Sequence, residues 1–287
     1  MKIGFIGAGK VGFSLGKFLS LGDAEITGYY SKTFENAKEA AQFTNSYAYN
    51  SLEDLTKNCD TIFITVPDNF IQEIYEQLCK FKIKNKIICH TSGVLSAKYV
   101  FHNIESYGAY GLSIHPLFPI SSKTSSYKNL KDAFFCLEGN TDCIKIFDRL
   151  LTNLGSKTQI IEADSKSEYH AGCVIASNFM CGLINQSIKL LENCGFTSEE
   201  AKKAIEPLVR ANIDNIFEHG TIKALTGPIE RCDTNTIKKH LSILKTDEEY
   251  QLYISLSKQL LKISQLKNKD RDYKELIKIL EEERNPI

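Results

Sequence analysis

The stretch Met1-Lys-Ile-Gly-Phe-Ile-Gly7-Ala-Gly9-Lys-Val-Gly12 decides how the rest of the chain is read. An apolar strand runs into Gly7-x-Gly9-x-x-Gly12, and apolar residues at helical spacing follow at once. In this setting the first glycine allows a tight turn, the second lets backbone approach a pyrophosphate, and the third lets the helix pack closely on the sheet. The phosphates then lie at the positive end of the helix. The sequence predicts a dinucleotide site formed by Gly7, Ala8, Gly9, Lys10, Val11 and Gly12.

Composition sets the broad class of protein. The 287 residues are enough for two domains, and Lys+Arg and Asp+Glu are both 35, so charge gives no reason to expect a nucleic acid or a membrane as partner. No apolar run approaches the ~20 residues that span a bilayer, and the first residues lack the pattern of a signal peptide. We expect a cytoplasmic protein.

The nine cysteines form no Cys-x-x-Cys pair and no zinc-type cluster with histidine, so we expect no metal site. Most lie in apolar segments, where a thiol usually acts as a small buried hydrophobe. We assign this role to Cys59, Cys79, Cys89, Cys136, Cys173, Cys181 and Cys194. Reduced thiols also agree with a cytoplasmic location.

The residues that follow the second expected strand, Glu25–Tyr30, indicate which of two cofactors, NAD or NADP, the protein binds. An NAD site needs an acidic residue about 20 residues past the glycines, for the ribose 2′-hydroxyl. Here the residues are Ser31, Lys32 and Thr33. Two hydroxyls and an ammonium suit a 2′-phosphate, so we favour NADP (NADPH). The alternative is that Lys32 is an ordinary solvated lysine.

Strands and helices alternate through the first half, which predicts crossover units and a mostly parallel sheet over residues 1–162. Ligands bind beyond the carboxyl ends of such strands. Besides the glycine turn and the second strand, the ends read from the sequence are Val66-Pro67-Asp68, Thr91-Ser92-Gly93 after His90, and His115 before Pro116. Either histidine could instead be a structural residue of the core.

From about residue 160 the strand pattern disappears, so residues 163–287 are expected to form an all-helical domain for substrate binding and dimerisation. Its first helix runs from about Ser165 to Asn193 and begins with a capping-box pattern, Ser165-x-x-Glu168. A second cap is expected at Thr197, and Pro207 should kink the helix that follows.

The first long helix holds the best candidates for chemistry. At ~100° per residue, Lys166, His170, Cys173 and Ser177 fall within an arc of about 60°, with Asn178 roughly 100° further round. An apolar set (Ala171, Val174, Ile175 and Phe179) occupies the other faces. Because an unpaired buried lysine costs several kcal/mol, we expect the polar stripe to face a wet cleft. The alternative is a solvated Lys166 and a core His170. A polar loop further on carries Arg231, a candidate for binding a carboxylate.

At this point the chain resembles a known group: the uncharacterised family of NADP-dependent oxidoreductases with a Rossmann domain and a C-terminal domain of unknown function that is similar to the C-terminal domain of 6-phosphogluconate dehydrogenase. Both halves carry the resemblance, in the glycine turn, Val66-Pro67-Asp68, His90-Thr-Ser-Gly93, His115-Pro116-Leu117, Tyr169-His170-Ala171, Ala176-Ser177-Asn178, and Leu225-Thr-Gly-Pro-Ile229 with Arg231 and Asp233.

The resemblance implies a wider superfamily that includes pyrroline-5-carboxylate reductase and ketopantoate reductase. Those relatives often place a Lys on the first long helix and an Asn four residues later, around the substrate carbonyl. Here Lys166 matches, but the residue four positions on is His170. The resemblance therefore supports cofactor and architecture more than it supports a substrate.

Three functions are consistent with the sequence. The first is an NADPH-dependent reductase of a small carbonyl or imine compound with a carboxylate, in which Lys166 or His170 donates a proton and Arg231 orients the carboxylate, with Ser177 and Asn178 beside them. The second is an NADP(H)-binding sensor or regulatory protein without turnover. The third is a dehydrogenase that uses NAD. A long apolar helix in a small helical domain also leads us to expect a homodimer.

Overall fold

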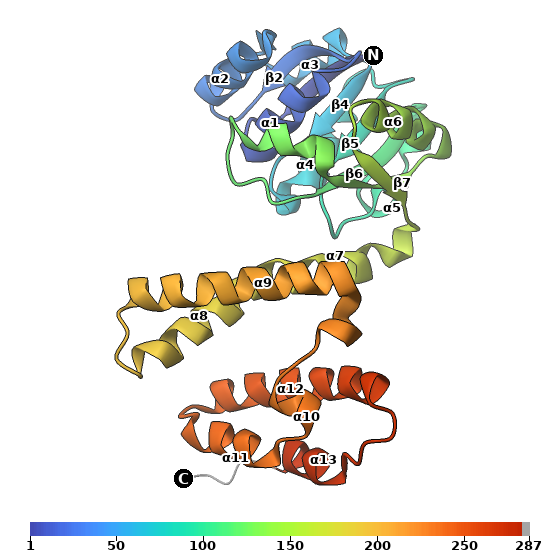
Figure 1. Cartoon of the computed structure of the whole chain (residues 1–287). Coiled ribbons are helices and arrows are strands. Elements are labelled where there is room, and N and C mark those ends of the chain that lie inside the picture. Colours follow the sequence, from blue (N-terminus) through green and yellow to red (C-terminus); the bar gives the residue numbers. More distant parts are fainter. Residues whose placement is uncertain (283–287) are drawn as a thin grey trace. The chain divides into compact units, whose positions relative to one another are not determined.

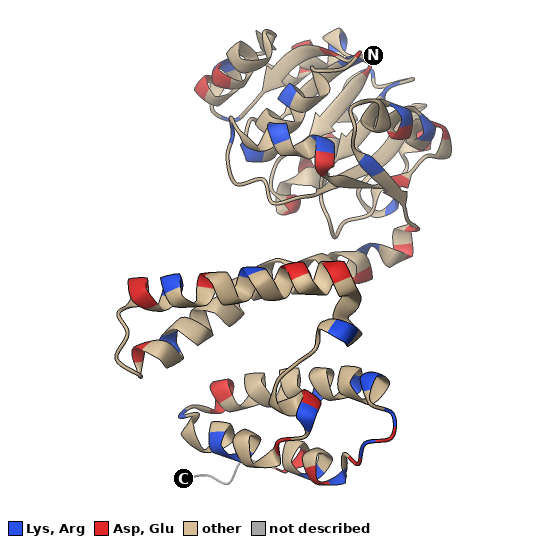
Figure 2. Cartoon of the chain, viewed as in Figure 1, with Lys and Arg blue, Asp and Glu red and all other residues tan. Residues whose placement is uncertain are grey.

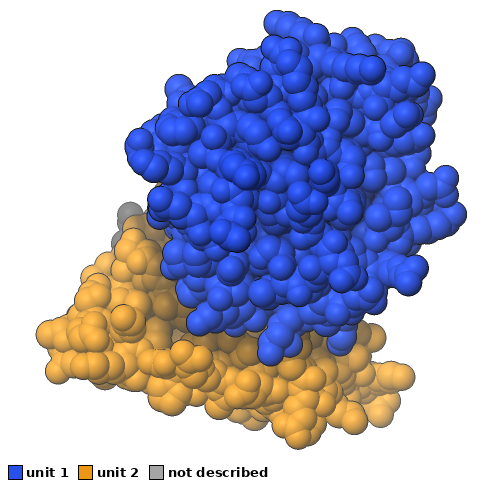
Figure 3. Space-filling model, turned by 90° about the horizontal axis from the view of Figure 1, so that it is seen from above, with its two compact units in different colours: residues 1–178 blue, residues 179–287 orange. Residues whose placement is uncertain are grey.

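The computed structural model describes residues 1–282, and the chain divides into two compact units (Figure 3). One spans Met1–Asn178 and the other begins at Phe179. The sequence changes character near residue 162, whereas the first compact unit continues through the helix that follows. The reason is that the start of this helix is anchored on the sheet, as described below.

The first unit alternates strands and helices in chain order (Figure 1). Its strands are β1 (Lys2–Ile6), β2 (Glu25–Tyr30), β3 (Tyr47–Ala48), β4 (Thr61–Ile64), β5 (Ile87–His90), β6 (Tyr110–Leu117), β7 (Phe134–Gly139) and β8 (Lys157–Ile160). Its helices are α1 (Lys10–Leu19), α2 (Phe34–Thr44), α3 (Leu52–Asn58), α4 (Asp68–Leu78), α5 (Ala97–Val100), α6 (Thr141–Asn153) and α7 (Lys166–Ala176), with 3₁₀ turns η1 (Ile104–Tyr107), η2 (Ser126–Asp132) and η3 (Ala163–Ser165).

The eight strands form one sheet in the order β3-β2-β1-β4-β5-β6-β7-β8. All neighbouring pairs are parallel except β6 and β7, which confirms the predicted mostly parallel sheet. The first six strands follow the order 3-2-1-4-5-6 of dinucleotide-binding folds, in which the direction of strand order reverses between β1 and β4. A ligand crevice is expected at that point.

Alternation along the strands builds an apolar core on each face of the sheet. Phe5 and Phe63 lie in one core with residues of α1, α2 and α6. Ile6, Ile62 and Ile64 lie in the other, with residues of α3, α4 and α5. Successive side chains of a strand point to opposite faces, which is why near-continuous apolar strands are needed when helices cover both sides.

The glycine turn between β1 and α1 is tightly packed, and a side chain at Gly7 or Gly12 would overlap neighbouring atoms. Gly7 has φ +104°, a conformation that L side chains rarely adopt. A Cβ on Gly12 would lie 2.3 Å from the carbonyl oxygen of Gly7 and 2.5 Å from Thr65 Oγ1. The Thr65 hydroxyl also donates a 2.8 Å hydrogen bond to the Gly7 carbonyl. Helix α1 thus packs against the turn at Gly12, in the role predicted for the third glycine.

The second unit is helical and has its own core (Figure 1). Its helices are α8 (Asn178–Glu192, which starts on the last residue of the first unit), α9 (Ser198–Ala224), α10 (Pro228–Arg231), α11 (Thr234–Ile243), α12 (Asp247–Lys267) and α13 (Lys274–Glu281). The apolar core joins α10 to α13, whereas α9 buries only Ala201 and Ala224. Figure 2 shows acidic and basic residues spaced along α9, where two i,i+4 ion pairs form, Lys203–Glu199 and Arg210–Glu206.

Two local predictions in the helical half are corrected by the structure. The predicted helix from Ser165 to Asn193 is interrupted at Ser177, whose φ −117° and ψ −67° separate α7 from α8. The capping box at Ser165 is wrong, because Ser165 has helical backbone angles and its side chain caps nothing. Helix α9 contains Pro207, and its residue with non-helical backbone angles is Gly220 (φ 80°, ψ 159°). The cap at Thr197 is confirmed as a full capping box.

The apolar side chains of the helical half are more exposed than the sequence predicts. Ile175 and Phe179 are 61% and 58% exposed, and Leu208 and Phe217 on α9 are 70% and 87% exposed. Helical residues Ala163–Glu192 are long and apolar enough to cross a membrane by length and composition, contrary to the expectation that no such run exists. Lys166, near the start of this stretch, is hydrogen-bonded to the Ser92 carbonyl after β5.

The nine cysteines are free thiols. Cys59, Cys89 and Cys136 are buried as predicted, but Cys181 and Cys194 are exposed. Both exposed thiols lie on or just after α8, in the part of the chain whose apolar surface is uncovered.

We predict that Gly12→Ala lowers the stability of the protein by about 1–3 kcal/mol, because the new methyl group overlaps backbone that cannot move freely. Gly9→Ala is the matched control, since a Cβ on Gly9 meets nothing within 4 Å. Urea unfolding of both variants checks this. Equal midpoints for Gly12→Ala and the unsubstituted protein would contradict the packing described here.

Candidate functional site

The predicted strand ends meet at one edge of the sheet. The glycine turn follows β1, Ser31 follows β2, Val66 follows β4, Thr91 follows β5, and His115 lies near the end of β6. Because β2, β1, β4, β5 and β6 are parallel, these ends form a continuous row.

The glycine turn leaves open space where a phosphate group could bind. Gly9 is the N-cap of α1 in an extended conformation, without a side-chain cap. No heavy atom lies within 4 Å of the position of a Cβ there. The first turn of α1 carries no acidic residue, and Lys10 begins the helix. An anion would therefore meet unshielded backbone N–H groups and the positive helix end.

The residues after β2 are accessible. Lys32 and Thr33 are exposed and Ser31 is half-buried. Thr33 is the N-cap residue of α2, but its hydroxyl makes no capping bond. The two hydroxyls and the ammonium are therefore accessible to a ligand at this edge.

Ser92, between β5 and α5, links several of these segments. Its hydroxyl donates a 2.7 Å hydrogen bond to Asp68 Oδ2 at the start of α4, and accepts bonds from the backbone N–H groups of Val94 and Leu95. Its own N–H donates to His90 Nδ1 at 3.2 Å. The proton of His90 therefore lies on the buried Nε2. His90 is a fully buried residue that fixes this loop, in agreement with the structural alternative.

Lys166, the first residue of α7, is only 2% exposed. Its Nζ donates to the carbonyl oxygen of Ser92 at 2.9 Å and to Ser113 Oγ on β6 at 2.8 Å. The alternative of a solvated lysine is therefore excluded. The ammonium is held by the ends of β5 and β6 within the first unit.

Two histidines and a tyrosine lie beside this lysine. His115 Nδ1 and the Tyr169 hydroxyl are 2.7 Å apart, and the rings of His115 and His170 are perpendicular with centroids 6.1 Å apart. A Cβ on Gly93 would lie 2.6 Å from His170 Nδ1 and 3.0 Å from His115 Nε2. Gly93 therefore allows both imidazoles to approach the loop after β5. Nδ1 of His170 is buried and has no hydrogen-bond partner within the described chain.

Burial dominates the electrostatics of the cluster. Burial lowers the pKa of Lys166, while Cys136 and Glu138 act in the opposite direction. Burial lowers the pKa of His115 to about 4, with further lowering by the charges of Lys166 and His170. Burial and the charge of Lys166 lower the pKa of His90 to about 3. At neutral pH, His90 and His115 are uncharged.

The remaining predicted residues lie elsewhere. Ser177 and Asn178 are exposed at the break between α7 and α8. Arg231 is exposed at the end of α10, in the second unit. Asp233, next to it, caps α11 by accepting a hydrogen bond from the N–H of Thr236.

Sequence reasoning missed several residues of the cluster. Thr65 and Ser113 are single hydroxyls in or beside apolar strands, and Tyr169 was noted only as part of a motif. The signal available was weak: a polar residue inside an otherwise apolar strand must find a partner when buried. Within residues 1–282, no group of His, Cys, Asp and Glu side chains has the geometry of a metal site.

Two domain models match parts of the chain. Residues 1–116 match the model of a Rossmann-like domain, and residues 133–260 match a domain of unknown function, DUF2520. No curated protein matches the chain. The two domains agree with the resemblance described from the sequence.

Solved structures share the fold over nearly the whole chain. A protein from Thermotoga maritima is 25% identical with a TM-score of 0.75, covering 93% of this chain and 99% of its own. A proposed NADP oxidoreductase from Bacteroides fragilis is 22% identical with a TM-score of 0.73, covering 91% and 98%. An imine reductase from Pseudomonas sp. is 13% identical with a TM-score of 0.65, covering 92% and 97%.

The buried His90 makes stability depend on pH. Its pKa of about 3 in the folded state lies below the ordinary value of about 6.5, so the unfolded state binds more protons between these values. The contribution of His90 to the free energy of unfolding is fully present above pH 6.5 and decreases as the pH is lowered. We predict that between pH 7 and pH 5 the protein loses about 2 kcal/mol more than His90→Asn, whose amide oxygen can replace Nδ1 as acceptor.

Urea unfolding at pH 7, 6 and 5 measures this difference. The comparison cancels the carboxyl groups, which titrate in both proteins. Parallel pH profiles for the two proteins would rule out a neutral His90 in the folded state.

Proposed function

We propose that this chain, which combines a Rossmann-like domain with a DUF2520 domain, is an NADPH-dependent reductase of a small carbonyl or imine compound. The observation that carries the proposal is the buried Lys166, held at the carboxyl ends of β5 and β6 beside His115, Tyr169 and His170. A perturbed ionisable cluster at the ligand edge of such a sheet is typical of an active site.

The first unit has the features needed to hold the cofactor. The glycine turn from Gly7 to Gly12 would bind the pyrophosphate, because Gly9 leaves open space in front of the N-terminus of α1. Ser31, Lys32 and Thr33 would bind the 2′-phosphate, which favours NADP over NAD. The loops at Val66-Pro67-Asp68 and Thr91-Ser92-Gly93 and the His115 side chain would line the rest of the site. When bound, NADPH supplies the hydride.

Lys166 or His170 would supply the proton that balances hydride transfer. Burial lowers the pKa of Lys166 and so makes its ammonium a better acid near neutral pH. Of its three ammonium protons, the bonds to Ser92 and Ser113 use two. His170 has a buried ring nitrogen without a protein partner among the described residues. His115 is neutral and serves to orient Tyr169.

Further polar residues lie outside this cluster. Arg231 has a guanidinium that can bind a substrate carboxylate through two parallel hydrogen bonds. Ser177 and Asn178, at the break after α7, are exposed polar groups that a substrate could contact. The imine reductase with the same fold supports a substrate with a C=N bond.

We further propose that the protein is a cytoplasmic homodimer formed through the helical half. Exposed Ile175, Phe179, Leu208 and Phe217 give this half more uncovered apolar surface than a monomer usually shows. We predict that Phe217→Asp converts a dimer to a monomer in gel filtration, whereas Leu21→Asp, at a 60% exposed site after α1, does not. A monomeric unsubstituted protein at micromolar concentration would contradict the dimer.

Binding and turnover together test the reductase. Fluorescence titration is expected to show tighter binding of NADPH than of NADH, and oxidation of NADPH is then followed with cyclic imines and keto acids. We predict that the double variant Lys166→Ala/His170→Ala loses about 100-fold or more in kcat while its affinity for NADPH is unchanged. The matched control is Lys189→Ala/His219→Ala, which changes the same residue types at exposed positions.

The outcomes separate the alternatives. Turnover that survives in the Lys166→Ala/His170→Ala variant would overturn the assigned proton donors. NADPH binding without oxidation of NADPH by any imine or keto acid would instead favour a sensor, and tighter binding of NADH would favour an NAD-dependent dehydrogenase.

A further inference from the structure

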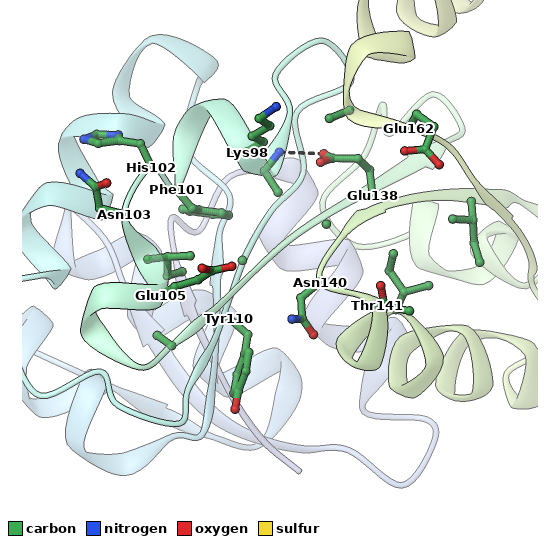
Figure 4. Close-up of a pocket in the computed structure, with 18 of the residues that line it drawn as sticks. Lys98, Phe101, His102, Asn103, Glu105, Tyr110, Glu138, Asn140, Thr141 and Glu162 are labelled. Carbon is green, nitrogen blue, oxygen red and sulfur yellow. Dashed lines mark hydrogen bonds between the residues drawn. The ribbon is translucent and has the colours of Figure 1, made fainter.

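The sheet face beneath Lys166 carries a second buried charge. Glu138, near the end of β7, is 3% exposed. Its Oε2 accepts a 2.7 Å hydrogen bond from the backbone N–H of Ala97, at the start of α5. Figure 4 shows this bond as a dashed line, with Glu138 turned toward α5 at the wall of a cavity of about 1140 Å³. A carboxylate buried this deeply needs more than one stabilising partner.

The strand register brings Glu138 to the group that holds Lys166. In the antiparallel pair β6–β7, Ser113 lies directly opposite Glu138. Directly opposed residues project on the same face, with Cβ atoms about 5 Å apart. Ser113 Oγ in turn is 2.8 Å from Lys166 Nζ. Carboxylate, hydroxyl and ammonium are therefore neighbours on one face of the sheet.

We propose that Glu138 is the buried counter-charge that keeps the Lys166 ammonium protonated and in place, acting across the Ser113–Glu138 strand pair. Glu138 is a positioning residue, because its own carboxylate is bonded to α5. The charge pair exists whether or not the protein converts a substrate. Only its expected effect on turnover rests on the proposed reductase.

The other groups around Lys166 are less suited to this role. Burial raises the pKa of the Cys136 thiol, which is therefore uncharged at neutral pH. His90 and His115 are neutral, with pKa values of about 3 and 4. Asp68 also raises the pKa of Lys166, but it acts less strongly than Glu138, and its exposed carboxylate accepts from Ser92 Oγ. The side chains that face Lys166 from α7 itself, Tyr169, His170 and Cys173, include no carboxylate.

The interaction is mutual. Burial raises the pKa of Glu138, while the backbone N–H of Ala97, the charge of Lys166 and, less strongly, the backbone N–H of Lys98 lower it. Burial lowers the pKa of Lys166, and the charge of Glu138 raises it. Glu162, after β8, acts on Glu138 with the opposite sign to Lys166. Each of the two charges thus lowers the free-energy cost of burying the other.

The test is an NMR titration of the Lys166 Nζ resonance in the full-length protein with ¹⁵N-labelled lysine, assigned with the Lys166→Arg variant. In Glu138→Gln, whose amide oxygen can still accept from Ala97, the pKa of Lys166 is expected to fall by about one unit or more, a tenfold change in proton affinity. Glu162→Gln is the matched control and should leave the pKa of Lys166 unchanged. An unchanged Lys166 titration in Glu138→Gln would overturn the proposal.

A reciprocal measurement does not depend on that variant folding. By linkage, Lys166→Met must raise the pKa of the Glu138 carboxyl, followed by ¹³C NMR, by the same amount. An equal Glu138 titration in Lys166→Met and the unsubstituted protein would also overturn the proposal. If turnover occurs, the high-pH limb of the kcat profile of Glu138→Gln moves to lower pH while KM for NADPH is retained. The titrations need no turnover, so failure of the counter-charge and failure of the reductase are distinguishable.

Discussion

The burial of one ammonium group organises this protein. Lys166 begins the first helix after the sheet, and its Nζ reaches back to the Ser92 carbonyl and the Ser113 hydroxyl. A lysine removed from water is tolerated only when hydrogen bonds and an opposite charge replace its hydration. Meeting that requirement ties α7 to the sheet, so that this helix belongs to the first compact unit although its sequence resembles the helical half.

The same requirement explains the composition of the strand ends. The loop after β5 must present a carbonyl to Lys166, and it is held in shape by bonds from Ser92 to Asp68 and to the buried His90. Gly93 is small because two imidazoles approach it closely. These contacts stabilise the fold. They also place several ionisable side chains together at the edge of the sheet where dinucleotide folds bind their ligands. Structure and the proposed chemistry thus draw on the same residues.

The helical half presents a different situation. Helices α10–α13 enclose a core of their own, whereas α8 and α9 leave large apolar side chains uncovered. Exposed apolar surface of this kind usually marks an interface. The stretch from Ala163 to Glu192 is long and apolar enough, by length and composition, to cross a membrane.

Periodicity and glycine spacing in the sequence determined the alternating fold, the mostly parallel sheet, the glycine turn and the row of strand ends, because each depends on residues close together in the chain. The sequence also placed Lys166 and His170 on one helix face. Tertiary structure alone decided that Lys166 is buried, that His115 and Tyr169 join it, and that Ser113 and Glu138 lie beneath it, since these contacts join β5, β6, β7 and α7. Local pattern also failed at Ser177 and Gly220, where the position of a helix break depends on packing that no short stretch of sequence records.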